Sequence, residues 1–473
     1  MMPIPRPSPE SSSRSVAAMS ENSSPRGRLY PLILLCAGVE FFGVQAYAFG
    51  AHVLSAGLGL TPAEFALAST VYTFACIVAI FKHQWVTGRF GYRRYLLVST
   101  AVYVGASIAC AASTQLLVFC VARFLQGLGG GGLFLSSRLM CNLFLPPEKR
   151  LAGIMWMSHG ILLVPVFAPL STAGLTEFFG WRALFWQMAL LGALLWLAVW
   201  RGLPREAVAA DRDASHSPAA ALSFAVAIVA LEMLLQGFRW LDVNAHELLF
   251  LFPLLAVLGL TFFFLGERRN PQPWLDPRVL NDRPFVVGGL LSFMFYLVIV
   301  EFQYAAPLLG RGLGMSWWAV GGLLTLFNLS AYASYWLFQK QSDPAGKLKG
   351  WMMGGVAAMG GGCLLLAFLP PEPRWLYALP IVLQSCFAAF VIIPLSIKMF
   401  RNMAGSFYSH GYRTRLIMGK VAASLAISVA ALAIDKRLSV GMTLLEATQR
   451  QFLWLALISA LFLWMIERQK TIE

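Results

Sequence analysis

Charged residues are scarce in this chain: only 12% of its 473 residues are Asp, Glu, Lys or Arg. Ordinary globular domains carry about 25% charged residues. Hydrophobic residues make up 58% of the chain, which is more apolar surface than one soluble core of this size could bury. We therefore expect an integral membrane protein, in which lipid covers the apolar surface.

Recognisable metal, nucleotide and redox patterns are also missing. None of the seven cysteines forms a CxxC pair or lies at metal-ligand spacing from a histidine, so we interpret them as small apolar residues. No GxxxxGKS, GxxxxGKT or HExxH pattern occurs, which argues against ATP hydrolysis and against a catalytic zinc site. We expect no bound cofactor, no metal and no enzymatic activity.

One glycine-rich run, residues 127–132, formally matches the dinucleotide-binding pattern GxGxxG. It lies inside an apolar segment and follows no predicted strand, so the required structural context is absent. The run instead predicts close packing between helices, or a flexible point within one helix.

The chain is basic, with a formal net charge of +14. No soluble segment is long enough to fold as a nucleic-acid-binding module, so we do not expect nucleic acid as a partner. Cytoplasmic loops of membrane proteins collect Lys and Arg, and this tendency accounts for the basic charge.

Long apolar runs recur along the whole chain. A transmembrane helix needs about 20 mostly apolar residues, and within lipid its backbone must satisfy its own hydrogen bonds. The runs predict an all-α polytopic protein with fourteen transmembrane helices, at residues 30–51, 65–81, 95–113, 116–137, 151–173, 181–200, 219–238, 247–266, 285–306, 316–338, 350–369, 375–396, 416–434 and 450–466.

The distribution of the 36 Lys and Arg residues tests this topology. With both termini in the cytoplasm, Arg123 lies inside a span, and the seven outer cations are Arg182, Arg239, Arg311, Arg374, Lys436, Arg437 and Arg450. The other 28, Lys420 among them, fall in the predicted cytoplasmic segments. This imbalance is the positive-inside pattern and supports the predicted orientation.

The spans divide unevenly into two sets of six with a pair between them. Residues 1–28 are rich in Ser, Pro and Arg, lack the apolar core of a signal peptide, and are expected to be a disordered cytoplasmic tail. The predicted parts are a six-helix bundle at 29–200, a cytoplasmic linker at 201–218, two additional helices at 219–266, a second linker at 267–284, and a six-helix bundle with a short tail at 285–473.

Four segments carry a specific resemblance to a known family. They read GRFGYRR at 88–94, RFLQGLG at 123–129 and GWRALF at 180–185, together with the linker at 267–285. In these segments the chain resembles the major facilitator superfamily, and more narrowly its fourteen-span drug:proton antiporter family. The resemblance implies the major facilitator fold, two six-helix bundles plus two extra helices.

The resemblance also implies roles for individual residues. It assigns a gating loop to Arg89, Gly91, Arg93 and Arg94, with Asp343 in the corresponding second-half loop, and a helix-packing motif to Gln126, Gly127, Gly129 and Pro169. Gly88 stands where the family loop has Asp, which puts the family's charge-relay contact in doubt. Around Pro169, the glycine positions of the family's export motif hold Ala or Thr.

The family resemblance predicts a secondary transporter of a bacterial inner membrane that exports drug-like or amphipathic compounds against protons. The implied partners are a small-molecule substrate, protons, the lipid bilayer, a periplasmic adaptor protein and an outer-membrane channel. Two alternatives remain: an exporter of one native metabolite, such as a siderophore or an aromatic acid, and a transport-inactive membrane partner or sensor.

Ionisable residues within spans are expensive to bury and are functional candidates by default. The candidates for proton coupling or substrate binding are Glu40, Arg123, Glu232, Glu301 and His159. By helical rise, Glu40 and Arg123 differ in depth by about 5 Å. We therefore predict that Glu40 accepts the proton with Arg123 as its partner; the alternative is a static ion pair. Nearby, Gln45, Tyr47 and Tyr72 are candidates for lining the cavity.

Overall fold

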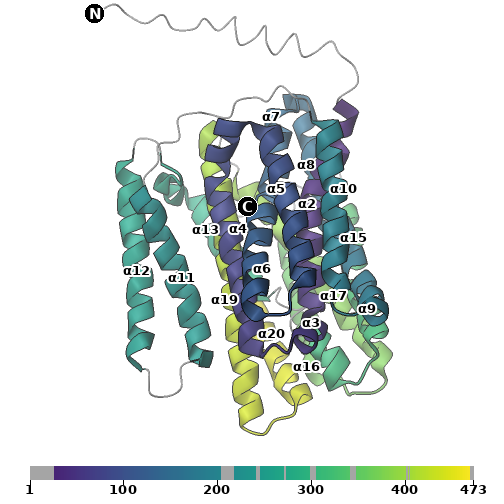
Figure 1. Cartoon of the computed structure of the whole chain (residues 1–473). Coiled ribbons are helices and arrows are strands. Elements are labelled where there is room, and N and C mark those ends of the chain that lie inside the picture. Colours follow the sequence, from purple (N-terminus) through teal and green to yellow (C-terminus); the bar gives the residue numbers. More distant parts are fainter. Residues whose placement is uncertain are drawn as a thin grey trace, which may run out of the picture.

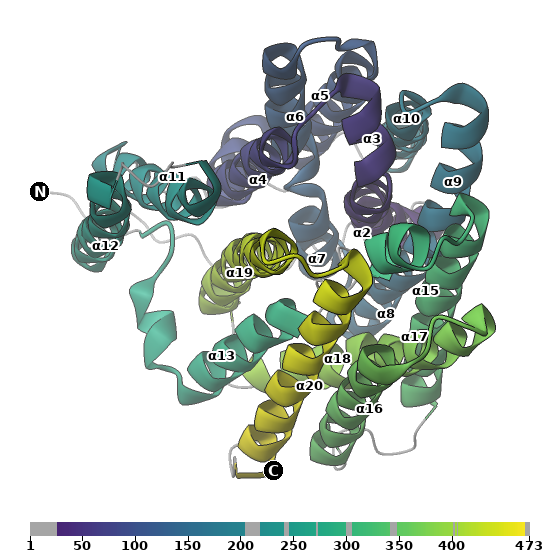
Figure 2. The same cartoon turned by 90° about the horizontal axis from the view of Figure 1, so that it is seen from below.

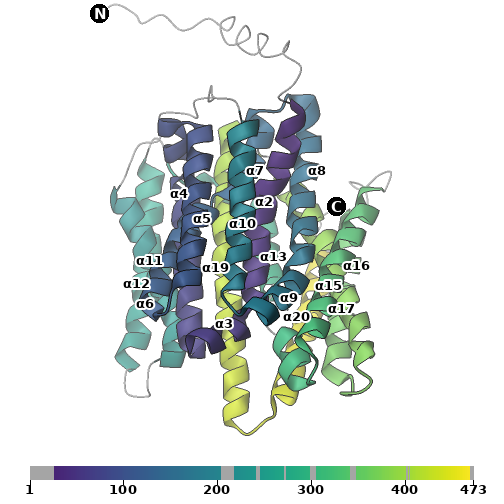
Figure 3. The same cartoon turned by 45° about the vertical axis from the view of Figure 1, so that its right-hand side comes forward.

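The computed structural model describes residues 26–468 apart from 204–217, 241–245, 271–272, 299–304, 341–347, 401–402 and 404. Every regular element within the described residues is a helix, as the composition predicts. Figure 3 shows the long helices running alongside one another, so that each helix buries its surface against its neighbours or leaves it for lipid.

The first half of the chain forms one side of the bundle, as seen from below in Figure 2. Its helices are α2 (Arg26–Phe49), α3 (Ala51–Leu58), α4 (Pro62–Phe90), α5 (Tyr92–Ala112), α6 (Leu116–Gly130), α7 (Leu133–Leu143), α8 (Pro147–Leu163), α9 (Ala168–Phe179) and α10 (Ala183–Gly202). The predicted fourth span is therefore two helices, because α6 ends and α7 begins on either side of Gly131 and Gly132.

The second half forms the opposite side of the bundle (Figure 2). Its helices are α13 (Arg283–Val298), α15 (Trp317–Gln339), α16 (Leu348–Phe368), α17 (Ala378–Phe387), α18 (Ile393–Met399), α19 (Gly405–Ser439) and α20 (Leu444–Arg468). Short π-helical turns at Leu308–Gly312 and Ala388–Ile392 interrupt the regular α geometry.

The two additional helices, α11 (Pro218–Trp240) and α12 (His246–Arg269), form a pair outside the main bundle (Figure 1). They pack against each other, and α11 also touches α4 and α19. The pair therefore contacts one helix from each half of the chain.

Nine helical segments among the described residues are long and apolar enough to cross a membrane. Helices also occupy the other five predicted spans, as α4, α11, α13, α15 and α19. The count of fourteen spans stays a prediction.

Two segments that the sequence predicts as loops are helical instead. A polar loop is expected at 402–415, but α19 begins at Gly405 and continues for 35 residues, about 52 Å at the helical rise. Likewise α4 continues to Phe90, so that Gly91 alone, with φ of +83°, turns the chain into α5. Both helix ends carry charged residues: Arg89 is exposed near the end of α4, whereas Arg413 is 3% exposed near the start of α19.

The two halves meet along two lines of helix contact. Helix α4 packs on α19, and the segment from α8 to α9 packs on α15. Close approach along the second line needs small residues: a Cβ added at Gly321 of α15 would lie 3.0 Å from Cβ of Ala173 and 3.3 Å from the carbonyl oxygen of Pro169.

Candidate functional site

The interior of the bundle holds a buried ion pair between the two halves. Glu40 of α2 is 3% exposed, and its Oε1 lies 3.0 Å from Nζ of Lys420 on α19. The Lys420 side chain keeps 24% of its surface exposed. A carboxylate and an ammonium from helices 380 residues apart in the chain thus meet inside the bundle.

The other oxygen of Glu40 binds the start of a half-helix. Oε2 accepts a hydrogen bond of 2.9 Å from the backbone N–H of Phe134, the second residue of α7. The first N–H groups of a helix have no partner within that helix, and the aligned peptide dipoles place partial positive charge there. The break between α6 and α7 therefore supplies a cap for the Glu40 carboxylate.

The glycines of the broken span let neighbouring helices approach it. A Cβ at Gly127 would lie 2.4 Å from the carbonyl oxygen of Tyr72, and one at Gly129 would lie 2.5 Å from the backbone nitrogen of Tyr103. At Gly131 a Cβ would lie 2.4 Å from Cα of Cys76. None of these positions has room for a larger residue, so α4 and α5 lie directly against this span.

Arg123 is held by aromatic rings rather than by Glu40. Its guanidinium carbon lies 3.8 Å from the ring centre of Tyr47 and 4.1 Å from that of Tyr72. Nη1 donates to Oε1 of Gln126, whose Nε2 donates to Ser107 over 2.8 Å. Arg123 is 3% exposed, and its Nε has no hydrogen-bond partner among the described residues.

This geometry corrects the predicted pairing of Glu40 with Arg123. Both oxygens of Glu40 are engaged elsewhere, by Lys420 and by the Phe134 N–H. The argument from helical rise compared only depth, whereas the side chains that meet are chosen by how the helices are rotated and packed. The rings of Tyr47 and Tyr72 lie against Arg123, and their expected place as cavity-lining residues stays a prediction.

Lys420 is a site residue that the sequence interpretation missed by counting it with the cytoplasmic loop. It lies four residues inside the predicted span 416–434, so the rule that selected Glu40, an ionisable group within a span, would also have selected Lys420. The positive-inside count therefore loses one cytoplasmic cation, and the imbalance remains.

His159 lies at the contact between the halves. Its ring centre is 5.7 Å from that of Tyr332 and 5.6 Å from that of Tyr335, both on α15. Its Nδ1 has no hydrogen-bond partner among the described residues. This position favours helix packing over a place beside Glu40, and its role in proton transfer stays a prediction.

The remaining predicted residues divide between described and undescribed segments. Arg93 donates to the carbonyl of Trp200 in the last turn of α10 over 2.8 Å, while Arg89 and Arg94 are exposed. Pro169 lies in the first turn of α9, directly after the 3-10 turn at Val164–Phe167 that separates α8 from α9. Glu301, Asp343 and the Glu232 side chain lie outside the described residues.

Contacts between the halves occur on both sides of the ion pair. On the predicted cytoplasmic side, Nε of Arg138 on α7 donates to the hydroxyl of Tyr408 on α19 over 2.6 Å. On the opposite side, the Trp317 ring of α15 stacks on Phe49 of α2 with centres 3.9 Å apart, and Trp317 Nε1 donates to Thr176 over 3.4 Å. Opening either face requires one of these sets to separate.

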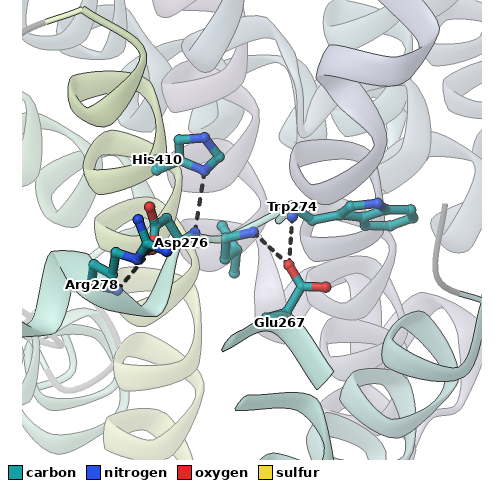
Figure 4. A network of polar contacts seen from close by, with 6 residues as sticks. Glu267, Trp274, Asp276, Arg278 and His410 are labelled. Carbon is teal, nitrogen blue, oxygen red and sulfur yellow. Dashed lines mark hydrogen bonds and ion pairs between the residues drawn. The ribbon is translucent and has the colours of Figure 1, made fainter. Parts of the chain in front are cut away.

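A second polar cluster joins the extra helices to α19, as Figure 4 shows. Glu267 at the end of α12 is 1% exposed and accepts hydrogen bonds from the backbone N–H groups of Trp274 and Leu275, over 2.5 and 3.2 Å. The N–H of Asp276 donates to Nδ1 of His410 over 3.2 Å. These bonds hold the linker against the predicted cytoplasmic end of α19.

Comparison with known proteins agrees with this architecture. The family model described as Major Facilitator Superfamily matches residues 33–427. The chain is 26% identical to the "Multidrug export protein EmrB" of Haemophilus influenzae, over 51% of this chain and 47% of that one. It is 25% identical to the "Fatty acid resistance protein FarB" of Neisseria gonorrhoeae, over 52% and 49%. The chain thus spans about half the length of these two curated relatives.

A solved structure shows the same fold over nearly the whole chain. The POT family transporter PepTSo superposes with a TM-score of 0.65 at 16% identity, covering 94% of this chain and 98% of that one. The predicted resemblance to the drug:proton antiporters is confirmed at low identity by the relatives named above. The chain accordingly belongs to the major facilitator superfamily, a family of transporters rather than enzymes.

Proposed function

We propose that this chain exports drug-like or amphipathic organic compounds in exchange for protons, by alternating access, and that Glu40 carries the proton. The observation that carries the proposal is the buried pair of Glu40 with Lys420, because its two members come from opposite halves of the transporter. A change in the charge of Glu40 therefore acts directly on the contact between the halves.

Protonation of Glu40 would remove one charge from a pair that depends on both. A buried ion pair is stable only while each charge has its partner, and loss of one partner typically costs about 3–5 kcal/mol. Two hydrogen bonds join the halves at the two faces of the bundle: Arg138 with Tyr408 on the predicted cytoplasmic side, and Trp317 with Thr176 on the opposite side. During alternating access each of these contacts must open in turn. A proton that weakens the central pair lowers the barrier to that rearrangement.

The names of the relatives support the class of cargo and the direction. One relative is named for multidrug export and another for fatty acid resistance. Both names fit the removal of amphipathic compounds from the cell. We extend the proposal to a bacterial inner membrane with both termini in the cytoplasm, and to a periplasmic adaptor and an outer-membrane channel as partners.

The test is transport by the purified full chain in liposomes with an imposed pH gradient. We expect amphipathic dyes to move only when the gradient is present, and in the direction opposite to the protons. The Glu40→Gln variant should lose gradient-driven movement to the level of protein-free liposomes. The matched control is Glu148→Gln, because Glu148 is an exposed carboxylate in the first turn of α8.

Each outcome has a distinct reading. Full coupled transport by Glu40→Gln would exclude Glu40 as the proton carrier. Movement of a single compound without dye movement would favour an exporter of one metabolite. An intact protein that moves nothing under either gradient would favour a transport-inactive partner and reject the proposed function.

A further inference from the structure

The interior of the bundle holds more positive than negative charge among the described residues. Only two carboxylates in this part of the chain are buried, Glu40 and Glu267. Glu267 lies at the far end of α12 and binds the linker. Glu40 is therefore the one buried acid of the described residues beside two interior cations, Lys420 and Arg123.

Lys420 already neutralises Glu40 when no cargo is present. Its Nζ lies 3.0 Å from the carboxylate, so the ionised acid is paired within the protein itself. An exchanger that releases its proton must return with an ionised carboxylate, and burying that charge alone is costly. A cationic cargo could supply the missing charge, but here Lys420 supplies it.

Arg123 has no carboxylate partner in the part of the chain that the structure describes. Among the described residues no ion pair involves it, and two tyrosine faces and the Gln126 carbonyl hold it instead. The two rings lie against the guanidinium, and its Nε–H has no hydrogen-bond partner among the described residues. The N–H edge is the part of arginine that binds carboxylates and related anions.

We propose that the cargo of this transporter carries no positive charge, with an amphipathic anion preferred, and that Lys420 is the residue that sets this preference. The inference rests on the proposed function, since it concerns the cargo exchanged for the proton at Glu40. Lys420 takes the place at Glu40 that a cationic drug would need, and the excess positive charge of the described interior residues repels such a drug. An anionic head group instead gains the unpaired edge of Arg123.

The experiment compares two amphipathic dyes of opposite charge in the same liposomes under a pH gradient: anilinonaphthalene sulfonate, an anion, and ethidium, a cation. We expect the native chain to move the anion faster than the cation by ~10-fold or more, because like charges in an interior site are strongly disfavoured. The Lys420→Gln variant should reverse this preference, because Glu40 is then free to pair with ethidium. The Lys420→Arg variant should keep it.

The matched control is Lys436→Gln, which removes an exposed lysine from the same helix and should change neither rate. Gradient-driven movement of ethidium in preference to the anion by the native chain would overturn the inference while leaving the proposed function intact. An unchanged preference in folded Lys420→Gln protein, checked by size-exclusion profile, would also overturn it. Absence of gradient-driven movement of both dyes would instead reject the proposed function.

Discussion

Arg123 and Lys420 are both interior cations, but different chemistry holds each of them. The flexible stem of Lys420 brings a compact ammonium to Glu40. The planar guanidinium of Arg123 lies against two tyrosine rings and donates to Gln126. Lysine and arginine are therefore not interchangeable at these positions, because only arginine offers a flat surface to two rings.

This difference gives a prediction for Arg123. The Arg123→Lys variant should be less stable by about 1–2 kcal/mol, because an ammonium loses the contact of the guanidinium with the Tyr47 and Tyr72 rings and one hydrogen bond to Gln126. Thermal unfolding in detergent would measure the loss. The control is Arg94→Lys, since Arg94 is exposed. Equal melting temperatures for the two variants would show that the two tyrosine rings contribute nothing specific to arginine.

At the scale of the element, the most informative feature is the interrupted fourth span. Its break leaves the N–H of Phe134 free to cap Glu40, while its glycines keep α4 and α5 in direct contact with it. Discontinuous helices recur at the ion and substrate sites of transporters, because half-helix ends supply partial charge inside the membrane. Here the glycine run allows close helix packing and also creates the helix start whose N–H binds the Glu40 carboxylate.

The Gly131→Ala variant tests the packing requirement. The added Cβ would lie 2.4 Å from Cα of Cys76, so α4 must shift, and overpacking of this kind typically costs about 1–3 kcal/mol. A methyl group added at Gly105 of α5 would meet no atom within 4 Å, so Gly105→Ala is the matched control. We expect a lower yield of folded protein and a lower melting temperature for Gly131→Ala alone. Identical behaviour of both variants would contradict the close approach.

At the scale of the whole molecule, the pair α11 and α12 is attached to both halves. Helix α11 touches α4 and α19, and Lys82 of α4 lies 3.8 Å from the ring centre of Trp274 in the linker. The same linker donates from Asp276 to His410 of α19. The extra helices therefore bridge the two halves at the predicted cytoplasmic end, where α4 and α19 must separate for that face to open.

His410 makes this attachment dependent on pH. Its Nδ1 accepts hydrogen bonds from Asp276 N–H and from Arg413, which requires the neutral ring. Burial and the charge of Arg413 lower the pKa of His410 from 6.5 to about 4. His410 has its lower pKa while the linker is bound to α19. Neutral His410 therefore stabilises this contact fully above pH 6.5, and the stabilisation is lost as the pH falls toward 4.

Hydrogen exchange of the linker amides, corrected for intrinsic rates, measures this effect. Protection of the amides of residues 274–276 should decrease as the pH is lowered from 7 to about 4, the pKa of docked His410. In His410→Gln the side chain still offers an acceptor but does not titrate, so the decrease should disappear. The same pH dependence in both proteins would assign it to another group.

The sequence alone was sufficient for the features that depend on local composition and spacing. Apolar runs predicted an all-helical membrane protein, and the segments around Arg89, Arg123 and Trp181 identified its superfamily, which the family model confirmed. The packing role of the glycines at 127–132 was also predicted from the sequence, because close helix approach depends on what one residue can fit at one position.

Only the tertiary structure decided which charges meet. The sequence selected Glu40 and Arg123 separately but paired them wrongly, and it placed Lys420 in a loop. The partner of Glu40 is 380 positions away, and the choice depends on how α2, α7 and α19 are rotated toward one another. Hydropathy and helical rise determine how deep a residue lies in the bilayer, whereas long-range packing determines its neighbours at that depth.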